Sequence, residues 1–371
     1  MRIIFCGGGT AGHITPAIAV AEEIIKVDKN AKILFIGRNG GRENELVTKA
    51  GFKIKTINVG GLKRSLSLKN IKTVLNAIKA IKSASKIIED FKPDIILGTG
   101  GYVCWPVIYS GKKLGVRTAI HESNVTPGLT TRLIAGKCDK VFLNHNETAK
   151  HLSNKLNTVI VGNPLRSDFD KMTKAEAKRK LGFSQDEILI VSFGGSIGAE
   201  KINSVILEVI EEFSSKEEKI KHIHSTGERY FSDLKIDSEK YKSAGCTILP
   251  FIENMPTVLR AADIAVCRSG AMTLSELAAS EVAAILIPSP NVTDNHQYKN
   301  AKHLMDLKAA VVIEEKNLSS EVLINELKSL KNDKNGRKKR AKTLNALRTP
   351  DSARLILEEL FLKNENKKTA F

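Results

Sequence analysis

Short apolar runs alternate with longer amphipathic stretches along most of the chain. The runs are rich in β-branched residues, and each is followed by a turn and then by residues at helical spacing. Strands that are apolar on both sides are typical of a parallel sheet covered by helices, so the pattern predicts an α/β fold. In the first half the expected strands are residues 3–6, 32–36, 94–97, 118–121, 140–143 and 158–161.

The alternation starts again in the second half, after Asn163 and Pro164, which we interpret as a hinge. Each series opens with a glycine-rich turn after an apolar strand, which predicts two Rossmann-like domains with parallel sheets facing a central cleft. The expected domains are residues 1–163 and 164–362, with a C-terminal helix able to pack back on the first domain and a polar tail at 363–371. The second series has expected strands at 188–193, 221–224, 246–249, 264–267 and 284–287, and helices that include 272–280 and 300–307.

Composition narrows the class of protein. The chain has 371 residues, of which 42% are hydrophobic, enough for two separate cores. Glycines follow the first apolar strand directly, which leaves no room for a signal peptide, and no apolar run reaches the roughly 18 residues of a membrane-spanning helix. The five cysteines are scattered without CxxC spacing, which argues against a disulfide framework or a zinc site and favours a reducing cytosol.

The net charge of +17 is concentrated in the first half of the chain. Up to Asn163 there are 25 Lys and Arg against 11 Asp and Glu, and residues 46–88 contain no acid at all. Apolar residues recur at helical spacing among these lysines, as in an amphipathic helix lying on anionic lipid. The alternative is a solvated helix whose apolar stripe packs on the core. The residues expected at the membrane are Ile71, Lys72, Leu75, Ile78, Lys79 and Lys82.

Nucleic acid is a poor partner for this basic block. Lys greatly outnumbers Arg there, and aromatic side chains for base stacking are almost absent. We therefore expect an anionic membrane surface rather than DNA or RNA.

The first glycine turn, residues 7–12, matches GxGxxG, and Thr15 and Pro16 suit the cap and first turn of the helix that follows. Such a turn presents backbone N–H groups to an anion. A dinucleotide-binding dehydrogenase would also need an acid near the end of the second strand, about twenty residues on. Residues 35–39 contain none, which argues against that class.

Further glycine-containing segments each follow an apolar strand, so each is expected at the carboxyl edge of a sheet, where open α/β sheets bind ligands. These segments are residues 98–106, 194–199 and 268–276. In the last, Ser269 and Gly270 open a helix whose N-terminus suits a diphosphate. Glu276 lies one or two turns further on, where a carboxylate can accept from both ribose hydroxyls of a nucleotide. The alternative is a capped helix with an ordinary surface Glu.

Seven motifs run in order along nearly the whole chain. They are GGGTAGHITP at 7–16, GTGGYV at 98–103, HESN at 121–124, GNPLR at 162–166, GGSIGA at 194–199, CRSGAMTLSE at 267–276 and DNHQYKNA at 294–301. Together they resemble the MurG family, the bacterial N-acetylglucosaminyltransferases of glycosyltransferase family 28 that convert lipid I to lipid II in peptidoglycan synthesis. The resemblance implies a GT-B fold and an inverting transfer from UDP-N-acetylglucosamine to the 4-hydroxyl of the lipid-linked muramyl pentapeptide, with no catalytic metal or cofactor.

The resemblance also implies roles for individual residues. His13 is the expected general base, with Glu122 in reserve. Gly9, Gly100, Gly101 and Tyr102 are expected to lie at the acceptor diphosphate. The residues expected to bind the donor are Thr10, Ala11, Gly12, Asn124, Arg166, Ser196, the Ile252 backbone, Ala271, Met272, Thr273, Leu274, Ser275, Glu276 and Gln297.

Two residues depart from the family pattern. Ala11 stands where a glycine is often found, and its methyl group restricts the backbone of the first loop. Trp105 stands where the family usually has a small residue before the proline, so the shape of the expected acceptor-diphosphate loop is open.

The chemistry of sugar transfer fits these residues independently. The departing UDP gains negative charge while the attacking hydroxyl loses a proton, so the protein must stabilise a diphosphate and supply a base. A residue that titrates near neutrality suits the second task, and His13 is well placed for it. Asp168 and Asp170 match the metal-binding DxD pattern, but they follow the hinge rather than a glycine loop, so we interpret them as a surface feature.

Three hypotheses therefore stay open: a lipid-acceptor transferase at the cytoplasmic face of the cell membrane, a related GT-B transferase with another acceptor, and a non-catalytic basic binding module. The expected partners are UDP-N-acetylglucosamine, lipid I and an anionic membrane surface.

Overall fold

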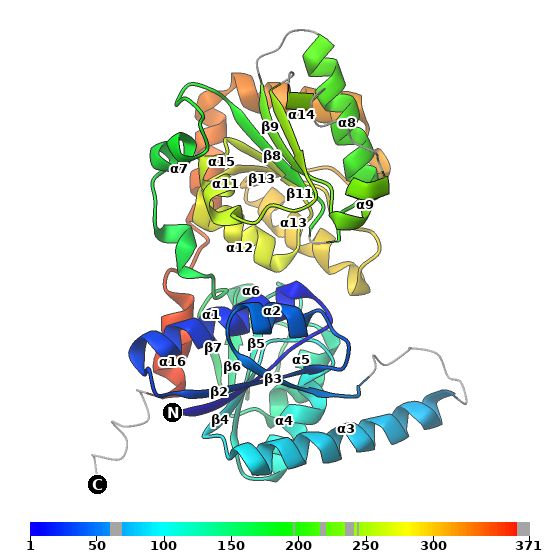
Figure 1. Ribbon diagram of the computed structural model, residues 1–371, viewed down its shortest axis with the longest axis vertical. Coiled ribbons are helices and arrows are strands. Elements are labelled where there is room, and N and C mark those ends of the chain that lie inside the picture. The colour runs from blue at the N-terminus through cyan, green and yellow to red at the C-terminus, as the bar shows by residue number, and fades with distance from the viewer. Residues whose placement is uncertain (60–68, 196, 216–219, 234–240, 243–244, 362–371) are drawn as a thin grey trace. The chain divides into compact units, whose positions relative to one another are not determined.

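The computed structural model describes residues 1–59, 69–195, 197–215, 220–233, 241–242 and 245–361, and for residues 69–77, 170 and 215 the backbone alone. The chain divides into two compact units, which Figure 1 shows coloured from blue to red along the sequence. The first unit comprises Met1–Arg166 together with Thr349–Phe371, and the second is Ser167–Arg348. The observed division after Arg166 lies three residues beyond the expected hinge.

A parallel sheet forms the centre of the first unit, with seven strands among the described residues in the order β3-β2-β1-β4-β5-β6-β7. The strands are β1 (Arg2–Cys6), β2 (Lys32–Arg38), β3 (Lys53–Ile57), β4 (Ile95–Gly98), β5 (Arg117–Glu122), β6 (Lys140–Leu143) and β7 (Thr158–Ile160). The parallel pairing confirms the α/β prediction. Strand β3 was not expected, because its lysines interrupt the apolar run; it lies at the sheet edge, where charged side chains remain in water.

Helices cover both faces of this sheet. They are α1 (Ala11–Val27), α2 (Glu43–Lys49), α3 (Lys69–Phe91), α4 (Cys104–Lys113), α5 (Leu129–Ile134), α6 (Asn146–Ala149) and α16 (Ser352–Leu360), with a 3₁₀ turn at Ala135–Lys137. Along β1, Ile3 and Phe5 pack under α1 and α16, whereas Ile4 and Cys6 pack under α3 and α4. Each strand is thus buried on both sides, which explains its unbroken apolar run.

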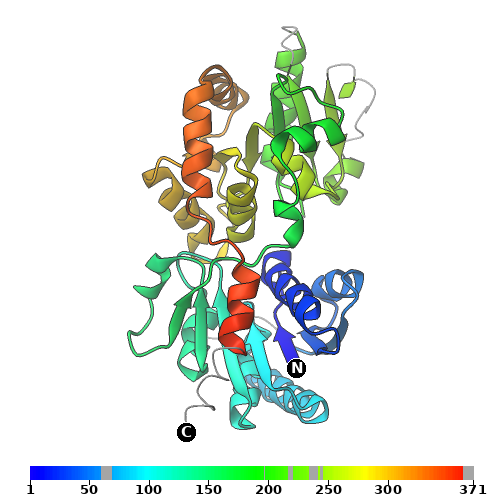
Figure 2. The same cartoon turned by 90° about the vertical axis from the view of Figure 1, so that its left-hand side faces the viewer.

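The C-terminal helix α16 belongs to the first unit, where it lies beside α1 (Figure 2, red and dark blue). Ile356, Leu357 and Leu360 are buried in the same core as the α1 side chains. Lys140 Nζ forms a half-buried ion pair with Glu359 at 2.6 Å, which fixes α16 to the start of β6.

The second unit repeats the plan. Its described residues form a six-stranded parallel sheet in the order β10-β9-β8-β11-β12-β13. The strands are β8 (Leu189–Phe193), β9 (Lys221–Ser225), β10 (Cys246–Leu249), β11 (Ile264–Cys267), β12 (Ala283–Leu286) and β13 (Ala310–Val312). Only β13 was not expected, because a three-residue edge strand is too short to show a period.

The helices of the second unit follow the same alternation. They are α7 (Lys174–Lys180), α8 (Glu200–Ser215), α9 (Glu228–Asp233), α11 (Met255–Ala261), α12 (Ala271–Ser280), α13 (His296–Asp306), α14 (Ser320–Asn332) and α15 (Lys334–Asn345), with 3₁₀ turns at Ser167–Asp170, Thr293–Asn295 and Glu315–Asn317. Helices α8 and α14 pack on one core with side chains of β8, β10 and β11. Helix α12 packs against both α11 and α15.

Each sheet has a point at which its strand order reverses. In the first unit this point lies between β1 and β4, and in the second between β8 and β11. Ligands of open α/β sheets bind at the carboxyl ends of the strands beside such a point. The four glycine-containing segments singled out from the sequence all leave these four strands.

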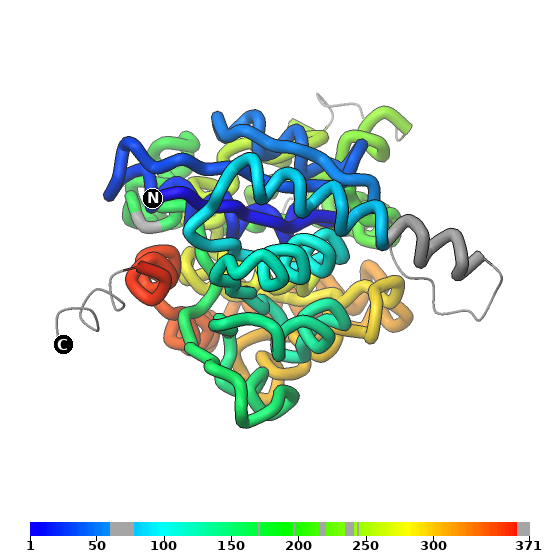
Figure 3. The backbone as a smooth tube through the Cα atoms, turned by 90° about the horizontal axis from the view of Figure 1, so that it is seen from below, coloured from blue at the N-terminus to red at the C-terminus, as the bar shows by residue number. Residues whose placement is uncertain are grey.

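Helix α3 continues the basic block of the sequence and lies beside α4 (Figure 3). Its second half packs on the core through Ala80, Ala84, Ile87 and Ile88, as the solvated-helix alternative requires. The expected membrane residue Ile78 is nevertheless 48% exposed, and Lys79 and Lys82 are exposed with it. The side chains of Ile71, Lys72 and Leu75 lie outside the described residues.

Of the helices in the described parts of the chain, not one has both the length and the apolar character needed to cross a membrane.

Candidate functional site

The first glycine loop, residues 7–10, leaves β1 and leads directly into α1. The helix begins at Ala11, five residues before the start that Thr15 and Pro16 predicted, so that prediction was wrong. Thr15 does not cap the helix; its hydroxyl donates to the Ala11 carbonyl oxygen at 2.9 Å. His13 consequently lies in the first helical turn, where its side chain has a fixed direction.

The His13 ring is held by the loop that precedes it. Its Nδ1 lies 3.0 Å from the Gly8 carbonyl oxygen, and the residue is half-buried. A carbonyl can only accept a hydrogen bond, so Nδ1 carries the proton and Nε2 of the neutral ring carries the lone pair. This is the arrangement that a general base requires.

The second glycine loop, which follows β4, encloses the same imidazole. Gly100 and Gly101 have φ angles of 114° and 83°, a region that favours glycine. A Cβ atom on Gly100 would lie 2.7 Å from His13 Cδ2, and one on Gly101 would lie 2.1 Å from the Gly8 oxygen. Only glycine at both positions allows the two loops to approach this closely.

The remaining residues expected at the acceptor diphosphate meet at the same place. A Cβ atom on Gly9 would lie 3.5 Å from the Tyr102 ring, so the two loops touch there. Trp105, the departure from the family pattern, is a residue of α4 that packs against the core and stacks on Tyr109 of the same helix, with ring centroids 5.9 Å apart. Its side chain is therefore accommodated by contacts along α4 and with the core.

Glu122 organises the loop that follows β5. Its Oε1 accepts from the Asn124 backbone N–H at 3.0 Å and from Asn124 Nδ2 at 2.9 Å. Its Oε2 accepts from the Gly128 N–H at 3.0 Å and from Thr131 Oγ1 at 2.6 Å. The side chain is buried, and both oxygens are engaged, so the carboxylate orients the Asn124 amide.

The hinge segment contributes a surface ion pair. Arg166 Nε lies 3.5 Å from Glu22 Oε1 on α1, and the Arg166 side chain is 55% exposed. Asp168, in the DxD pattern, pairs with Lys171 at 2.5 Å. The Asp170 side chain lies outside the described residues.

In the second unit, the glycine loop after β8 packs closely against the backbone that follows β9. A Cβ atom on Gly198 would lie 2.1 Å from the Thr226 oxygen, and Gly195 and Gly198 have φ angles of 88° and 80°. Asn203, near the start of α8, donates to the same Thr226 oxygen at 2.9 Å. Ser196, expected at the donor diphosphate, lies outside the described residues.

The N-terminus of α12 is suited to bind an anion. Its N-cap residue Gly270 has no side chain that could cap the first turn, and the positive end of a helix dipole favours an anion. Ala271, Thr273 and Ser275 are half-buried, whereas Met272 and Leu274 are buried in the unit. Only part of the expected 271–276 stretch can therefore present side chains to a ligand.

Glu276 lies in the second turn of α12 and is half-buried. No described residue forms a hydrogen bond or an ion pair with its carboxylate. Burial without a partner disfavours the charged form, which raises the pKa of Glu276 to about 7. A partly accessible carboxylate without a protein partner is suited to accept hydrogen bonds from a ligand.

Gln297, on α13, is held through both its side chain and its backbone. Its Oε1 accepts from the Ser289 N–H at 3.0 Å, and its carbonyl oxygen accepts from the buried Ser269 hydroxyl at 2.9 Å. The Gln297 amide therefore directs its NH₂ group away from Ser289. Arg268 supports this region by donating to the carbonyls of Ile287 and Pro288 and by pairing with Glu315.

Ile252, whose backbone was expected to contact the uracil, is 3% exposed in the loop after β10. Its neighbour Phe251 is 47% exposed. The buried side chain at 252 fixes the backbone of this loop.

Two residues that support the first site were missed from the sequence. The buried carboxylate of Glu43 accepts from the Arg38 N–H at 2.8 Å, and a Cβ atom on Gly8 would lie 2.4 Å from it. Thr99 donates its hydroxyl to the His13 carbonyl oxygen at 2.5 Å. The signal in the sequence was the neighbouring glycines: Gly8 lies against Glu43 and Gly7 against Thr99, and a Cβ atom at either position would collide with these side chains.

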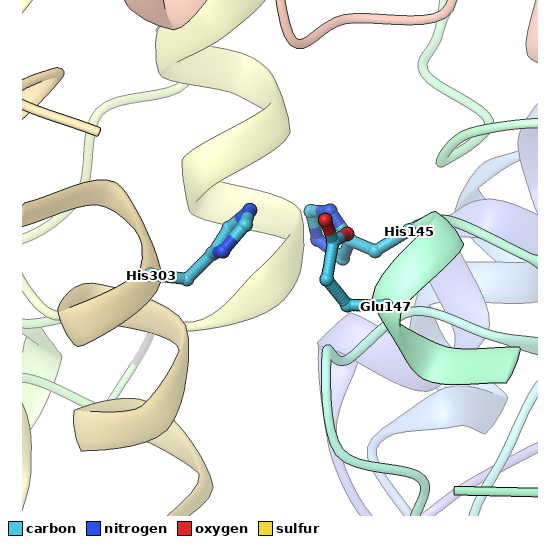
Figure 4. A group of neighbouring side chains, drawn as sticks. All are labelled: His145, Glu147 and His303. Carbon is cyan, nitrogen blue, oxygen red and sulfur yellow. The ribbon is translucent and has the colours of Figure 1, made fainter. Parts of the chain in front are cut away.

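His145 and Glu147 lie at the start of α6 in the first unit, and Figure 4 also draws His303, which belongs to α13 of the second unit. Among the described residues of either unit taken alone, there is no group of three or more His, Cys, Asp or Glu side chains that could hold a metal ion. No metal centre is assigned to either unit.

Comparison with known proteins gives matches over almost the whole chain. Residues 3–143 match the glycosyltransferase family 28 N-terminal domain, and residues 189–356 match the glycosyltransferase family 28 C-terminal domain. A protein of Thermoanaerobacter sp. strain X514, named UDP-N-acetylglucosamine--N-acetylmuramyl-(pentapeptide) pyrophosphoryl-undecaprenol N-acetylglucosamine transferase, is 45% identical over 89% of this chain and 91% of its own length. An Acetivibrio thermocellus protein with the same name is 41% identical over 96% of this chain and 97% of its own length.

A solved structure of Acinetobacter baumannii MurG resembles this fold with a TM-score of 0.75 at 23% identity, over 97% of this chain and 99% of that one. The likeness confirms the GT-B fold expected from the sequence.

Proposed function

This chain belongs to glycosyltransferase family 28, and from that premise we propose that it transfers N-acetylglucosamine from UDP-N-acetylglucosamine to the 4-hydroxyl of lipid I, with inversion, to form lipid II for peptidoglycan. The observation that carries this proposal is the 45% identity to a transferase of that name, sustained over 91% of the relative's length. The arrangement of polar groups in each unit supports it.

We assign the acceptor and proton transfer to the first unit. The bond between the acceptor oxygen and the anomeric carbon forms as the bond to UDP breaks, and the hydroxyl proton passes to His13 Nε2. The resulting imidazolium keeps its Nδ1–H bond to the Gly8 carbonyl, 3.0 Å away, which stabilises the charged ring. Glu122 is less suited to this step, because four donors already occupy its two oxygens.

We assign the donor to the second unit. The start of α12 would receive the diphosphate, helped by Ser196, and Glu276 would accept from the ribose hydroxyls. Gln297 would donate its amide NH₂ group to the sugar hydroxyls, because Ser289 already occupies its oxygen. Backbone dipoles and these side chains can stabilise the leaving diphosphate, so we propose that transfer requires no metal ion.

Transfer of radiolabelled N-acetylglucosamine onto lipid I tests the proposal directly. The expected product is a lipid-linked disaccharide, formed from UDP-N-acetylglucosamine but not from UDP-glucose. Labelling of another lipid or of a soluble acceptor, with none of lipid I, would assign the chain to a related transferase. Binding of anionic vesicles without any sugar transfer would instead favour a binding module.

We further propose that the protein lies on the cytoplasmic face of the cell membrane through α3 and α4. The Ser110 hydroxyl donates to the Ile81 carbonyl at 3.1 Å and joins the two helices. Ile78 and Leu114, which are 48% and 39% exposed, each lie within about one turn of this contact. Exposed apolar side chains beside lysines suit an anionic lipid surface.

Vesicle binding tests this surface. Each Lys near an anionic membrane contributes about 1 kcal/mol, so Lys79→Glu with Lys82→Glu should release the protein from vesicles that contain phosphatidylglycerol. Lys338→Glu with Lys339→Glu on the exposed side of α15 is the matched control, because it changes the net charge equally. Equal loss of binding in both variants would show a non-specific effect of net charge.

A further inference from the structure

The start of α1 lacks the contacts that usually stabilise a helix N-terminus. Within the described chain, the N-cap residue Thr10 makes no side-chain cap hydrogen bond, and the first turn contains no acid. Pro16 lies inside the helix and has no N–H for the Gly12 carbonyl. The turn that carries His13 therefore depends on contacts from outside the helix.

Thr99 supplies such a contact from the end of β4. Its side chain is 2% exposed, and its Oγ1 lies 2.5 Å from the His13 carbonyl oxygen and 3.4 Å from the Cys6 carbonyl oxygen. A hydroxyl has one proton to donate, and the shorter distance directs it to His13. The backbone N–H of Thr99 donates to the Cys6 oxygen at 2.9 Å, so the residue itself is fixed to β1.

The space around this hydroxyl allows little movement. A Cβ atom on Gly7 would lie 2.6 Å from Thr99 Oγ1 and 3.0 Å from the His13 oxygen. The His13 ring is limited at the same time by Gly8, which accepts from Nδ1, and by Gly100, against which Cδ2 packs. A shift of the first turn would move the ring out of all these contacts.

We propose that Thr99 is a positioning residue of the transfer reaction. Its hydroxyl fixes the backbone of His13 at the otherwise uncapped start of α1, and this keeps the Nδ1–H bond to Gly8 and the direction of the Nε2 lone pair. The inference rests on the proposed function, because it requires His13 to take the acceptor proton. Small misplacements of a base are costly, since proton transfer needs hydrogen-bond reach to the reacting hydroxyl.

A pair of substitutions at residue 99 separates the hydroxyl from the packing of the side chain. Thr99→Val has nearly the same shape but no donor, and should lower kcat about ten-fold, with KM for the donor nearly unchanged. Thr99→Ser restores the donor and should return kcat to within about three-fold of wild type. Thr118→Val is the control, because Thr118 is also a buried threonine of this sheet whose hydroxyl donates to a backbone carbonyl, that of Lys137. Thr118 lies near the start of β5, whereas Thr99 follows the end of the neighbouring strand β4, so the control is at the other edge of the sheet from His13.

Combination with His13→Ala shows whether Thr99 acts through the base. If it does, Thr99→Val should have almost no further effect on kcat once His13 is replaced, a coupling that a purely structural role does not produce. Equal effects of Thr99→Val with and without His13, or no rescue by Ser, would overturn the inference while leaving the transferase assignment intact. A wild-type protein without transfer to lipid I would instead remove the proposed function.

Discussion

Replacing Glu276 by Gln is expected to make the second unit more stable at alkaline pH. Burial raises the pKa of the Glu276 carboxyl from its ordinary value of 4.5 to about 7. One pKa unit corresponds to about 1.4 kcal/mol, so ionisation of this carboxyl lowers the free energy of unfolding by about 3 kcal/mol. Gln has nearly the shape of the neutral acid and remains uncharged, so the variant avoids this loss.

The pH range follows from the proton that the folded state retains. Between pH 4.5 and about pH 7 the folded protein holds a proton that the unfolded chain has already released. Stability therefore falls as pH rises through this range and does not change further above it. Wild type and Glu276→Gln should be similarly stable near pH 4.5 and differ by about 3 kcal/mol at pH 8.

Thermal unfolding at the two pH values measures this difference. For a domain of this size, about 3 kcal/mol corresponds to a Tm increase of roughly 6–12 °C in the variant at pH 8. Glu253→Gln, at an exposed position, is the control and should leave Tm nearly unchanged. Saturating UDP should stabilise wild type more than Glu276→Gln, because the ribose hydroxyls would donate to the ionised carboxylate. An equal Tm at pH 8, or a difference independent of pH, would refute the reasoning.

Three further predictions concern other groups. His13→Ala should lower kcat about 10²- to 10⁴-fold with UDP affinity nearly unchanged in a calorimetric titration, and wild-type turnover would exclude His13 as the base. EDTA should not reduce transfer to lipid I, and activity abolished by EDTA and restored by magnesium would contradict the metal-free mechanism. His222 and His224 each lie 2.7 Å from the buried Ser192 hydroxyl, and burial lowers their pKa values to about 3 and about 4. Each buried histidine should therefore lower the free energy of unfolding by about 1.4 kcal/mol per pH unit as pH falls below 6.5. Denaturant titrations at several pH values measure this dependence, and His224→Gln should make the dependence on pH less steep. The same dependence in wild type and variant would count against this account.

The sequence predicted the architecture well because the strands of both sheets are buried on two sides. Their apolar runs are set by local composition, and only the edge strands β3 and β13 escaped the pattern. The glycine loops were also predictable, because backbone that approaches another segment closely must avoid Cβ atoms. Gly100 and Gly101 illustrate this, since each would collide with His13 or Gly8 if it carried a side chain.

The supporting residues of the site could not be predicted in the same way. Thr99 and His13 are 86 residues apart in the chain, and their contact depends on β1 and β4 being neighbours at the switch point. Glu43 is the first residue of the short helix α2, where acids are common, and no local pattern indicates that its carboxylate is buried against Gly8. The start of α1 was misplaced because Thr15 and Pro16 form a good capping signal locally, whereas the turn before them is fixed by the tertiary contact to Thr99.

The discontinuous first unit has a consequence for the order in which the chain acquires its structure during synthesis. Residues 167–348 contain every strand of the second sheet, so that unit can close its core as soon as it leaves the ribosome. The first unit is synthesised earlier but cannot complete its core, because the side of α1 that packs on α16 remains uncovered until Ile356, Leu357 and Leu360 are synthesised. This part of the α1 surface therefore stays exposed while the second unit is synthesised, and we expect the nascent first unit to need protection from aggregation during that time.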